Sequence, residues 1–130
     1  MKPPSEDQEQ IRLFNWIYLK EKEDPRYKMI MHVPNQGSAG FGGMLRSKKM
    51  KAMGARKGWF DIFVCLPKGP FHGLFIELKA LKGRPSKEQL DWQKMYEQYG
   101  YCAVFCYGGR EALEKIQAWL TTETIAEQNT

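Results

Sequence analysis

The chain has 130 residues, the length of one ordinary domain, so a single hydrophobic core must support the whole function. Hydrophobic residues make up 42% and charged residues 27%, a globular composition that confines disorder to the ends. We expect one domain over residues 1–130, with an ordered core from about 5 to 121 and a polar C-terminal tail. No apolar run reaches the roughly 18 to 20 residues that cross a bilayer, and the N-terminus lacks the apolar core of a signal peptide. These features predict a cytoplasmic protein with no membrane partner.

The cysteines give a consistent prediction of the compartment. Cys65, Cys102 and Cys106 are odd in number, lie in apolar strand-like runs and show no paired CxxC spacing. We expect buried, reduced thiols and no zinc site.

The positive charge is concentrated in one block. No acidic residue lies between Asp24 and Asp61, whereas the basic residues of that interval contribute +8 to a total of +5, which leaves the rest of the chain at −3. Six of them form the candidate DNA-contacting set: Arg46, Lys48, Lys49, Lys51, Arg56 and Lys57. Such a block suits a polyanion, for which phosphate backbones are the commonest case, although a solvated basic surface has the same composition.

The first predicted helix runs from about Ser5 to Glu23 and ends before Pro25. Ser5 and Gln8 have the spacing of a capping box. Glu6 falls on the same helical stripe as Leu13 and Ile17, an unusual position for a carboxylate, unless it only complements the helix dipole in the first turn. Glu9 lies on the flank of that face, so the sequence leaves open which of the two acids has a function.

Residues 28–34, KMIMHVP, predict a short strand, and residues 35–43 predict a glycine-rich loop. Residues 44–54 predict a short basic helix closed by Gly54. The loop lacks the Gly-Lys-Ser/Thr ending of a P-loop, so we interpret the whole segment as a flexible basic flap.

Two strands, over residues 59–67 and 73–81, are joined by a turn over residues 68–72. A helix follows over residues 84–100, with Ser86 and Gln89 as a second capping box and Gly100 as its stop. Continuous apolarity predicts a fully buried strand over residues 101–107, and residues 110–120 form a closing amphipathic helix. The predicted fold is α/β in the order α-β-β-β-α-β-α.

The hairpin brings charged residues together. Residues two apart on a strand project to one side, so Glu77 and Lys79 share a face with Phe75. An antiparallel pairing about residue 69 would place Asp61 opposite Glu77, with their Cβ atoms about 5 Å apart. A solvent-facing ion pair would give the same ELK pattern by itself.

Two carboxylates this close repel each other unless a cation neutralises them. Oxygen ligands without His or Cys indicate Mg²⁺ or Mn²⁺. Lys79 could orient or help deprotonate the attacking water and stabilise charge on a phosphorane. The cluster is therefore a candidate hydrolytic site.

Three further residues have two interpretations each. Gln89 could position water or the scissile phosphate, or serve only as a capping residue. His72 is expected at the surface of the turn rather than against a substrate. Trp59, beside the basic run and two residues before Asp61, could contact a nucleotide or belong to the core.

In its motifs the chain resembles the virus-type replication-repair nucleases (VRR-NUC) of the PD-(D/E)XK superfamily, in the stand-alone type of phages and bacteria. The resemblance rests on SEDQEQ, VPNQG, MGARKGWFDIFV, HGLFIELKALKG and PSKEQLDWQ, in this order and spacing over nearly the whole chain. It departs at Phe60, where the family often has proline before the aspartate.

The resemblance implies a restriction-endonuclease-like core with a mixed sheet flanked by helices. It implies metal ligation by Asp61, Glu77 and the main-chain carbonyl of Leu78, with Glu6 as a candidate further contact through water. Lys79 matches the catalytic lysine of the family, Gln89 its motif glutamine and Glu6 its helix-one acid.

We therefore expect a Mg²⁺- or Mn²⁺-dependent, structure-selective DNA endonuclease in a bacterial or phage-infected cell. By the same resemblance it is a Holliday-junction resolvase acting as a homodimer on branched DNA, since a four-way junction and an isologous dimer share two-fold symmetry. Two alternatives remain: a nuclease for flaps, nicks or duplex ends, and a non-catalytic basic module that binds nucleic acid.

Overall fold

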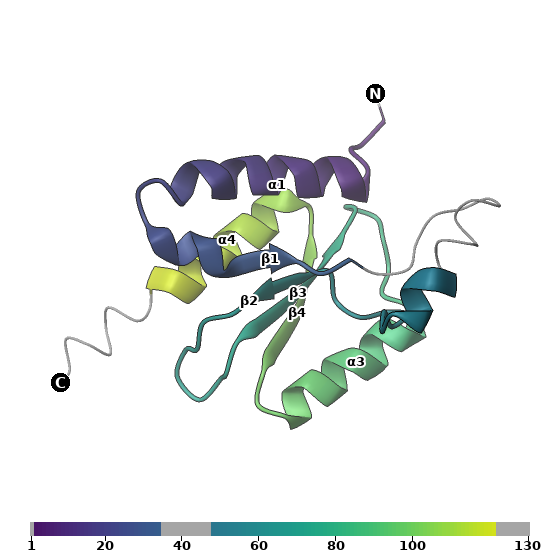
Figure 1. The fold of residues 1–130 in the computed structure, drawn as a ribbon. Helices are drawn as coiled ribbons and strands as arrows, with labels where there is room; N and C mark the ends of the chain where they lie inside the picture. Colours follow the sequence, from purple (N-terminus) through teal and green to yellow (C-terminus); the bar gives the residue numbers. More distant parts are fainter. Residues whose placement is uncertain (1, 35–47, 122–130) are drawn as a thin grey trace.

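The structure, a computed structural model, describes residues 2–34 and 48–121 and shows a four-stranded sheet with helices on both faces (Figure 1). The elements in chain order are α1 (Glu6–Lys20), the 3₁₀-helix η1 (Pro25–Met29), β1 (Ile30–His32), β2 (Ile62–Val64), β3 (Leu74–Lys79), α3 (Lys87–Gln98), β4 (Cys102–Tyr107) and α4 (Gly109–Thr121). The predicted order of helices and strands is confirmed.

The sheet is mixed, in the spatial order β1-β2-β3-β4. β1 and β2 are antiparallel, as are β2 and β3, whereas β4 runs parallel to β3 after the α3 crossover. Ile62 pairs with Ile76, Phe63 with Phe75 and Val64 with Leu74, so the pairing is centred on residue 69 as predicted. Between the two strands the chain turns at an isolated antiparallel bridge of Lys68 and Phe71.

One face of the sheet forms the larger core. α1 contributes Leu13 and Ile17 and α4 contributes Ile116 and Trp119, all buried against the even-numbered residues of β2 and β3. α3 covers the other face, where Tyr96 packs on Phe75 and Phe60. β3 lies between both layers and all six of its residues are buried.

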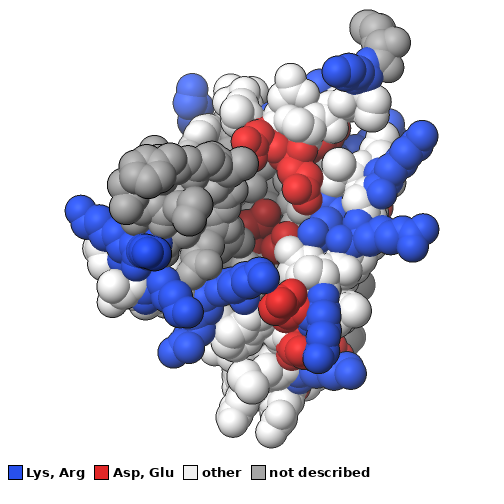
Figure 2. All heavy atoms as spheres, turned by 90° about the vertical axis from the view of Figure 1, so that its right-hand side faces the viewer, with Lys and Arg blue, Asp and Glu red and all other residues white. Residues whose placement is uncertain are grey.

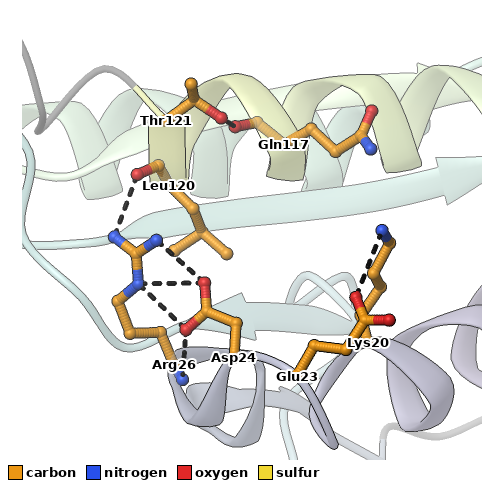
Figure 3. A network of polar contacts seen from close by, with 7 residues as sticks. All are labelled: Lys20, Glu23, Asp24, Arg26, Gln117, Leu120 and Thr121. Carbon is orange, nitrogen blue, oxygen red and sulfur yellow. Dashed lines mark hydrogen bonds and ion pairs between the residues drawn. The ribbon is translucent and has the colours of Figure 1, made fainter.

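A polar network joins the start of η1 to the C-terminal end of α4 (Figure 3). The Arg26 guanidinium donates to both oxygens of Asp24, with an Nη2–Oδ2 distance of 2.8 Å, and Nη1 donates to the Leu120 carbonyl at 3.0 Å. Carbonyls in the last turn of a helix lack intrahelical partners, so the cation satisfies one at the end of α4.

Three details of the predicted elements are corrected. The first helix ends at Lys20 rather than Glu23, because the chain turns there into η1, whose N-cap is Asp24. The strand predicted over residues 59–67 is paired only at Ile62–Val64. β4 is an edge strand in the described sheet and is half-buried, not fully buried, so its apolar run reflects packing under α3 and α4 rather than enclosure between two strands.

The cysteine prediction also needs correction. All three thiols are free, but only Cys106 is buried, Cys102 is intermediate and Cys65 is exposed just beyond the end of β2. Burial raises the pKa of the Cys106 thiol to about 12.

The glycine-rich loop predicted at residues 35–43, together with Arg46, lies outside the described residues. The basic helix is present over residues 48–52 and is followed by Gly54, whose φ of 111° is a left-handed conformation that suits glycine after a helix. None of the helices in the described ranges has the length and apolarity needed to cross a membrane.

Candidate active site

Asp61 and Glu77 converge at one end of the β2–β3 hairpin. Asp61 directly precedes β2 and follows the register that pairs Ile62 with Ile76, which places it opposite Glu77. Its Oδ1 accepts a hydrogen bond from the Leu78 amide at 3.2 Å, so its carboxylate lies over the end of β3. Glu77 is only 5% exposed. The sequence prediction of a shared face for these residues is therefore confirmed.

The environment raises the pKa of both carboxyl groups. Burial raises the pKa of Asp61 to about 6, against the lowering effect of the Leu78 amide and of His32. Burial, followed by the nearby Asp61 charge, raises the pKa of Glu77 to about 8, although Lys79 opposes the shift. Two acids with raised pKa values in one place form a site that gains from a bound cation.

The two oxygens of Glu77 differ in their partners. Oε2 accepts from Gln89 Nε2 at 2.9 Å and lies 3.7 Å from the Lys79 ammonium. Oε1 is buried and has no hydrogen-bond partner among the described residues. A buried carboxylate oxygen without a donor is costly, so this oxygen is the natural place for a ligand.

Lys79 lies between two acids. Its Nζ is 3.7 Å from Glu77 Oε2 and 3.9 Å from Glu6 Oε1, and its side chain is almost wholly buried. Glu6 is in the first turn of α1, beyond the packed core, so its side chain remains 51% exposed. The structure therefore brings the helix-one acid Glu6 to the candidate site.

Glu9, the alternative acid on α1, has a different environment. It is buried in line with Leu13 and Ile17, so the core-facing stripe runs through Glu9 rather than Glu6. Its Oε2 accepts the Gly109 amide at 2.5 Å, at the start of α4. A carboxylate at a helix N-terminus satisfies a free amide and complements the dipole, so Glu9 joins two helices.

Gln89 caps α3, as one of its two interpretations predicted, and it also contacts Glu77. Its Oε1 accepts from the Ser86 amide at 2.9 Å, which completes the capping box of α3. Its Nε2 donates to Glu77. The capping bond thus fixes the amide in the orientation that presents its donor to the site.

The backbone geometry of β3 gives the side to which the Leu78 carbonyl points. Neighbouring carbonyls on a strand point to opposite sides, and the Lys79 carbonyl accepts from Gly108 on the β4 side. The Leu78 amide points to the β2 side, where it donates to Asp61, and the carbonyl of a strand residue points the same way as its amide. The Leu78 carbonyl therefore points to the side of β3 on which Asp61 lies.

Five of the six predicted DNA-contacting residues are described, and all five are exposed: Lys48, Lys49, Lys51, Arg56 and Lys57. Figure 2 shows acidic side chains near the centre of this face of the molecule, with Lys and Arg side chains around them. The segment is attached to α3, since Trp92 Nε1 donates to the Lys57 carbonyl at 2.8 Å and Lys57 Nζ lies 3.5 Å from Glu88 Oε1. The basic segment therefore adjoins the helix that carries Gln89.

Trp59 belongs to an aromatic cluster, with its ring edge-on to Phe75 and Tyr96 at centroid distances of 5.6 and 5.0 Å. His72 is exposed in the turn, as predicted, beside Tyr101.

Comparison with known proteins finds a similar solved structure. No protein-family model matches the sequence, and a search of curated proteins found no match. A solved structure described as "VRR_NUC domain protein" superposes with a TM-score of 0.74 at 27% identity, covering 92% of this chain and 90% of that one. The chain is thus similar to a VRR-NUC domain in fold over nearly its whole length. This similarity supports a nuclease domain in general terms, which agrees with the motifs and with the site built above.

The one residue that departs from the VRR-NUC motifs, Phe60, has a structural role of its own. Phe60, at the position where proline often precedes the aspartate, is fully buried and donates its amide to the Tyr96 hydroxyl at 2.9 Å. Proline has no amide hydrogen and could not make this bond. The approach of the chain to Asp61 is therefore held by a helix α3 side chain.

Sequence reasoning missed two residues at the candidate site. His32 Nδ1 lies 2.8 Å from the Asp61 carbonyl, and Tyr96 holds the residue before Asp61. The helical spacing of Tyr96 predicted a core residue, but not its contact with Phe60. His32 had none, because the long connection between β1 and β2 does not fix their register.

Proposed function

We propose that this protein is a Mg²⁺- or Mn²⁺-dependent DNA endonuclease with its site at Asp61, Glu77, Lys79 and Gln89. The observation that carries the proposal is the unpartnered, buried Glu77 Oε1 beside the Asp61 carboxylate. A merely structural ion pair would have satisfied this oxygen, whereas a ligand site leaves it free.

The donor set fits a hard divalent cation. Asp61, Glu77 and the Leu78 carbonyl would hold it, and Glu6 could reach it through water, since all these ligands are oxygens. Within residues 2–34 and 48–121 no three His, Cys, Asp or Glu side chains are grouped as a metal site, so two carboxylates, the carbonyl and water would complete the coordination. When bound, such a cation would neutralise the carboxylates and polarise the scissile phosphate.

The protein's own residues have separate tasks. The Lys79 ammonium, held between Glu6 and Glu77, would orient the attacking water and stabilise the charge that develops on the phosphorane. Gln89 would keep the Glu77 carboxylate in one orientation through its hydrogen bond. The exposed lysines and arginines would hold the DNA backbone, which positions a strand without reading its bases.

We propose further that the enzyme acts as a homodimer on four-way junctions. This finer assignment is supported by the family resemblance and by symmetry, because an isologous dimer presents two sites to a two-fold symmetric substrate. Flaps, nicks and duplex ends remain the alternative substrates.

The test is an assay of purified protein with end-labelled four-way junction, flap, nicked and linear duplex DNA, in Mg²⁺, Mn²⁺ or EDTA. Asp61→Ala and Lys79→Met should lower the cleavage rate at least about 100-fold, as removal of groups that stabilise a transition state does. Asp91→Ala and Lys94→Met, which change exposed residues of α3, are the matched controls. Sedimentation of the free protein and of its junction complex would report the dimer.

Paired, symmetric nicks on the junction would support a resolvase, and cutting of flaps or ends alone would support the alternative nuclease. Wild-type rates in Asp61→Ala would show that the site is wrongly assigned. Salt-sensitive binding without cutting in any metal would favour the non-catalytic module.

A further inference from the structure

A hollow lined mainly by aromatic rings lies on the α3 face of the sheet. Its volume is about 460 Å³, within the range of ligand pockets. Phe75 and Tyr96 lie deep in it, Trp59 and Trp92 are half-buried, and Tyr99 is 65% exposed. The hollow therefore presents aromatic side chains to solvent in one concave place.

Three of the rings are near parallel, whereas Trp59 is edge-on to them. Phe75 and Tyr96 are parallel within 8° at a centroid distance of 4.0 Å, and Trp92 is within 22° of Tyr96. A planar ligand that enters parallel to them would extend an existing stack. Every nucleobase has such a planar face, and stacking on aromatic side chains tolerates any sequence.

Cations border the hollow on the side of Trp92. A second hollow of about 400 Å³ shares Trp92 with the first and is lined by Lys51, Arg56 and Lys57. Lys57 pairs with Glu88, whereas no ion pair of Lys51 or Arg56 is found among the described residues. Aromatic rings beside cations match a nucleotide, which has an apolar base and an anionic phosphate. A second copy of the chain fits less well, because an isologous contact here would bring like charges together.

The hollow adjoins the candidate active site. Phe75 lies two residues before Glu77 on the same face of β3, and Trp59 lies two residues before Asp61. Two strand residues span about 6.6 Å, which corresponds to roughly two base steps of a DNA strand. A base in the hollow would belong to a nucleotide close to the phosphodiester at the carboxylates.

We propose that this aromatic hollow binds one unpaired nucleobase of the DNA strand to be cut, with the adjoining phosphates on Lys51 and Arg56. The proposal rests on the proposed function only in taking DNA as the substrate. A paired base is inaccessible to the hollow, so binding there selects DNA that exposes an unpaired base next to the cleavage point, as at a branch.

The test is a binding measurement in EDTA, which excludes cutting. Fluorescence anisotropy compares a labelled single strand with the same strand carrying abasic residues and with the duplex. Tyr99→Ala is the main variant, and Tyr18→Ala, which removes a comparably exposed tyrosine of α1 at 59%, is its control. Lys51→Ala and the control Lys94→Ala test the phosphate contacts.

We expect the wild type to bind the normal strand at least about fivefold more tightly than the abasic strand, the lower end of the range for base–aromatic stacking. Tyr99→Ala should abolish this difference, and Tyr18→Ala should preserve it. Lys51→Ala should weaken binding of both strands equally and lower the salt dependence by about one phosphate contact.

Equal affinity of the wild type for normal and abasic strands would overturn the proposal. An undiminished preference of Tyr99→Ala for the normal strand over the abasic strand would also overturn it. So would a change in the sedimentation mass of Tyr99→Ala without base-dependent binding, because this face would then be an interface between copies of the chain. If binding depends on the base but no substrate is cut in any metal, the proposed nucleobase site is upheld and the nuclease assignment is rejected. The failure of one proposal can therefore be distinguished from the failure of the other.

Discussion

Replacing Glu77 by Gln should remove a specific part of the pH dependence of stability. The carboxyl has an ordinary pKa of 4.5, which burial and Asp61 raise to about 8 in the folded chain. Between these values the folded state retains a proton that the unfolded state releases, so the free energy of unfolding falls as pH rises. The contribution is fully present below 4.5 and is lost as pH rises toward 8.

The size of the effect follows from the shift. Each pH unit within the interval removes about 1.4 kcal/mol, so raising the pH from 5 to 7 should cost the wild type about 2 to 3 kcal/mol at this residue. Glutamine has nearly the same shape and does not ionise, so Glu77→Gln should lose correspondingly less stability over the same range. Contributions of other groups largely cancel in the comparison.

Urea unfolding at both pH values, in EDTA to keep divalent cations from the carboxylates, measures the difference. Glu97→Gln, at an exposed position near the far end of α3, is the control and should behave as the wild type. If Glu77→Gln and the wild type lose the same free energy between pH 5 and 7, Glu77 does not hold a proton in the folded state and the electrostatic description of the site is wrong.

Four further variants test the packing around the site by urea unfolding. Glu9→Ala should lower the free energy of unfolding by about 1 to 3 kcal/mol, because a buried amide of α4 loses its acceptor. Glu6→Ala should change it by less than about 0.5 kcal/mol, since Glu6 is exposed, but should slow cleavage. Tyr96→Phe should cost about 1 to 3 kcal/mol by leaving the Phe60 amide unpaired. Gly58→Ala should cost at least about 1 kcal/mol, because φ is +82° and the added Cβ would lie 2.8 Å from a side-chain carbon of α3.

Each of these predictions can be contradicted by a specific result. A stable Glu9→Ala variant with slowed cleavage would exchange the roles given to the two acids of α1. Unchanged stability in Tyr96→Phe would mean that another group or water satisfies the Phe60 amide. A stable Gly58→Ala would show that the junction between the basic segment and α3 can adjust.

The candidate site was predictable where local geometry determined it. The sequence predicted a hairpin centred on residue 69, and the observed pairing of β2 with β3 has that centre, so Asp61 could be placed opposite Glu77 from the sequence. Alternation along β3 then placed Lys79 on the same side as Glu77. The strand β1 had no such constraint, because a long connection leaves its register with β2 open, and His32 was missed for that reason.

Burial and partner choice needed the tertiary structure. Helical periodicity put Glu6 and Glu9 close to the same face, but only the positions of α4 and β3 decided that Glu9 meets the Gly109 amide while Glu6 meets Lys79. The ELK pattern is compatible with a solvent-exposed ion pair, and only the enclosure of β3 by helices on both faces made Glu77 a buried acid with a raised pKa. Sequence determines which residues share a face, because that depends on local backbone geometry. Desolvation depends on what packs over that face, which is a property of the whole fold.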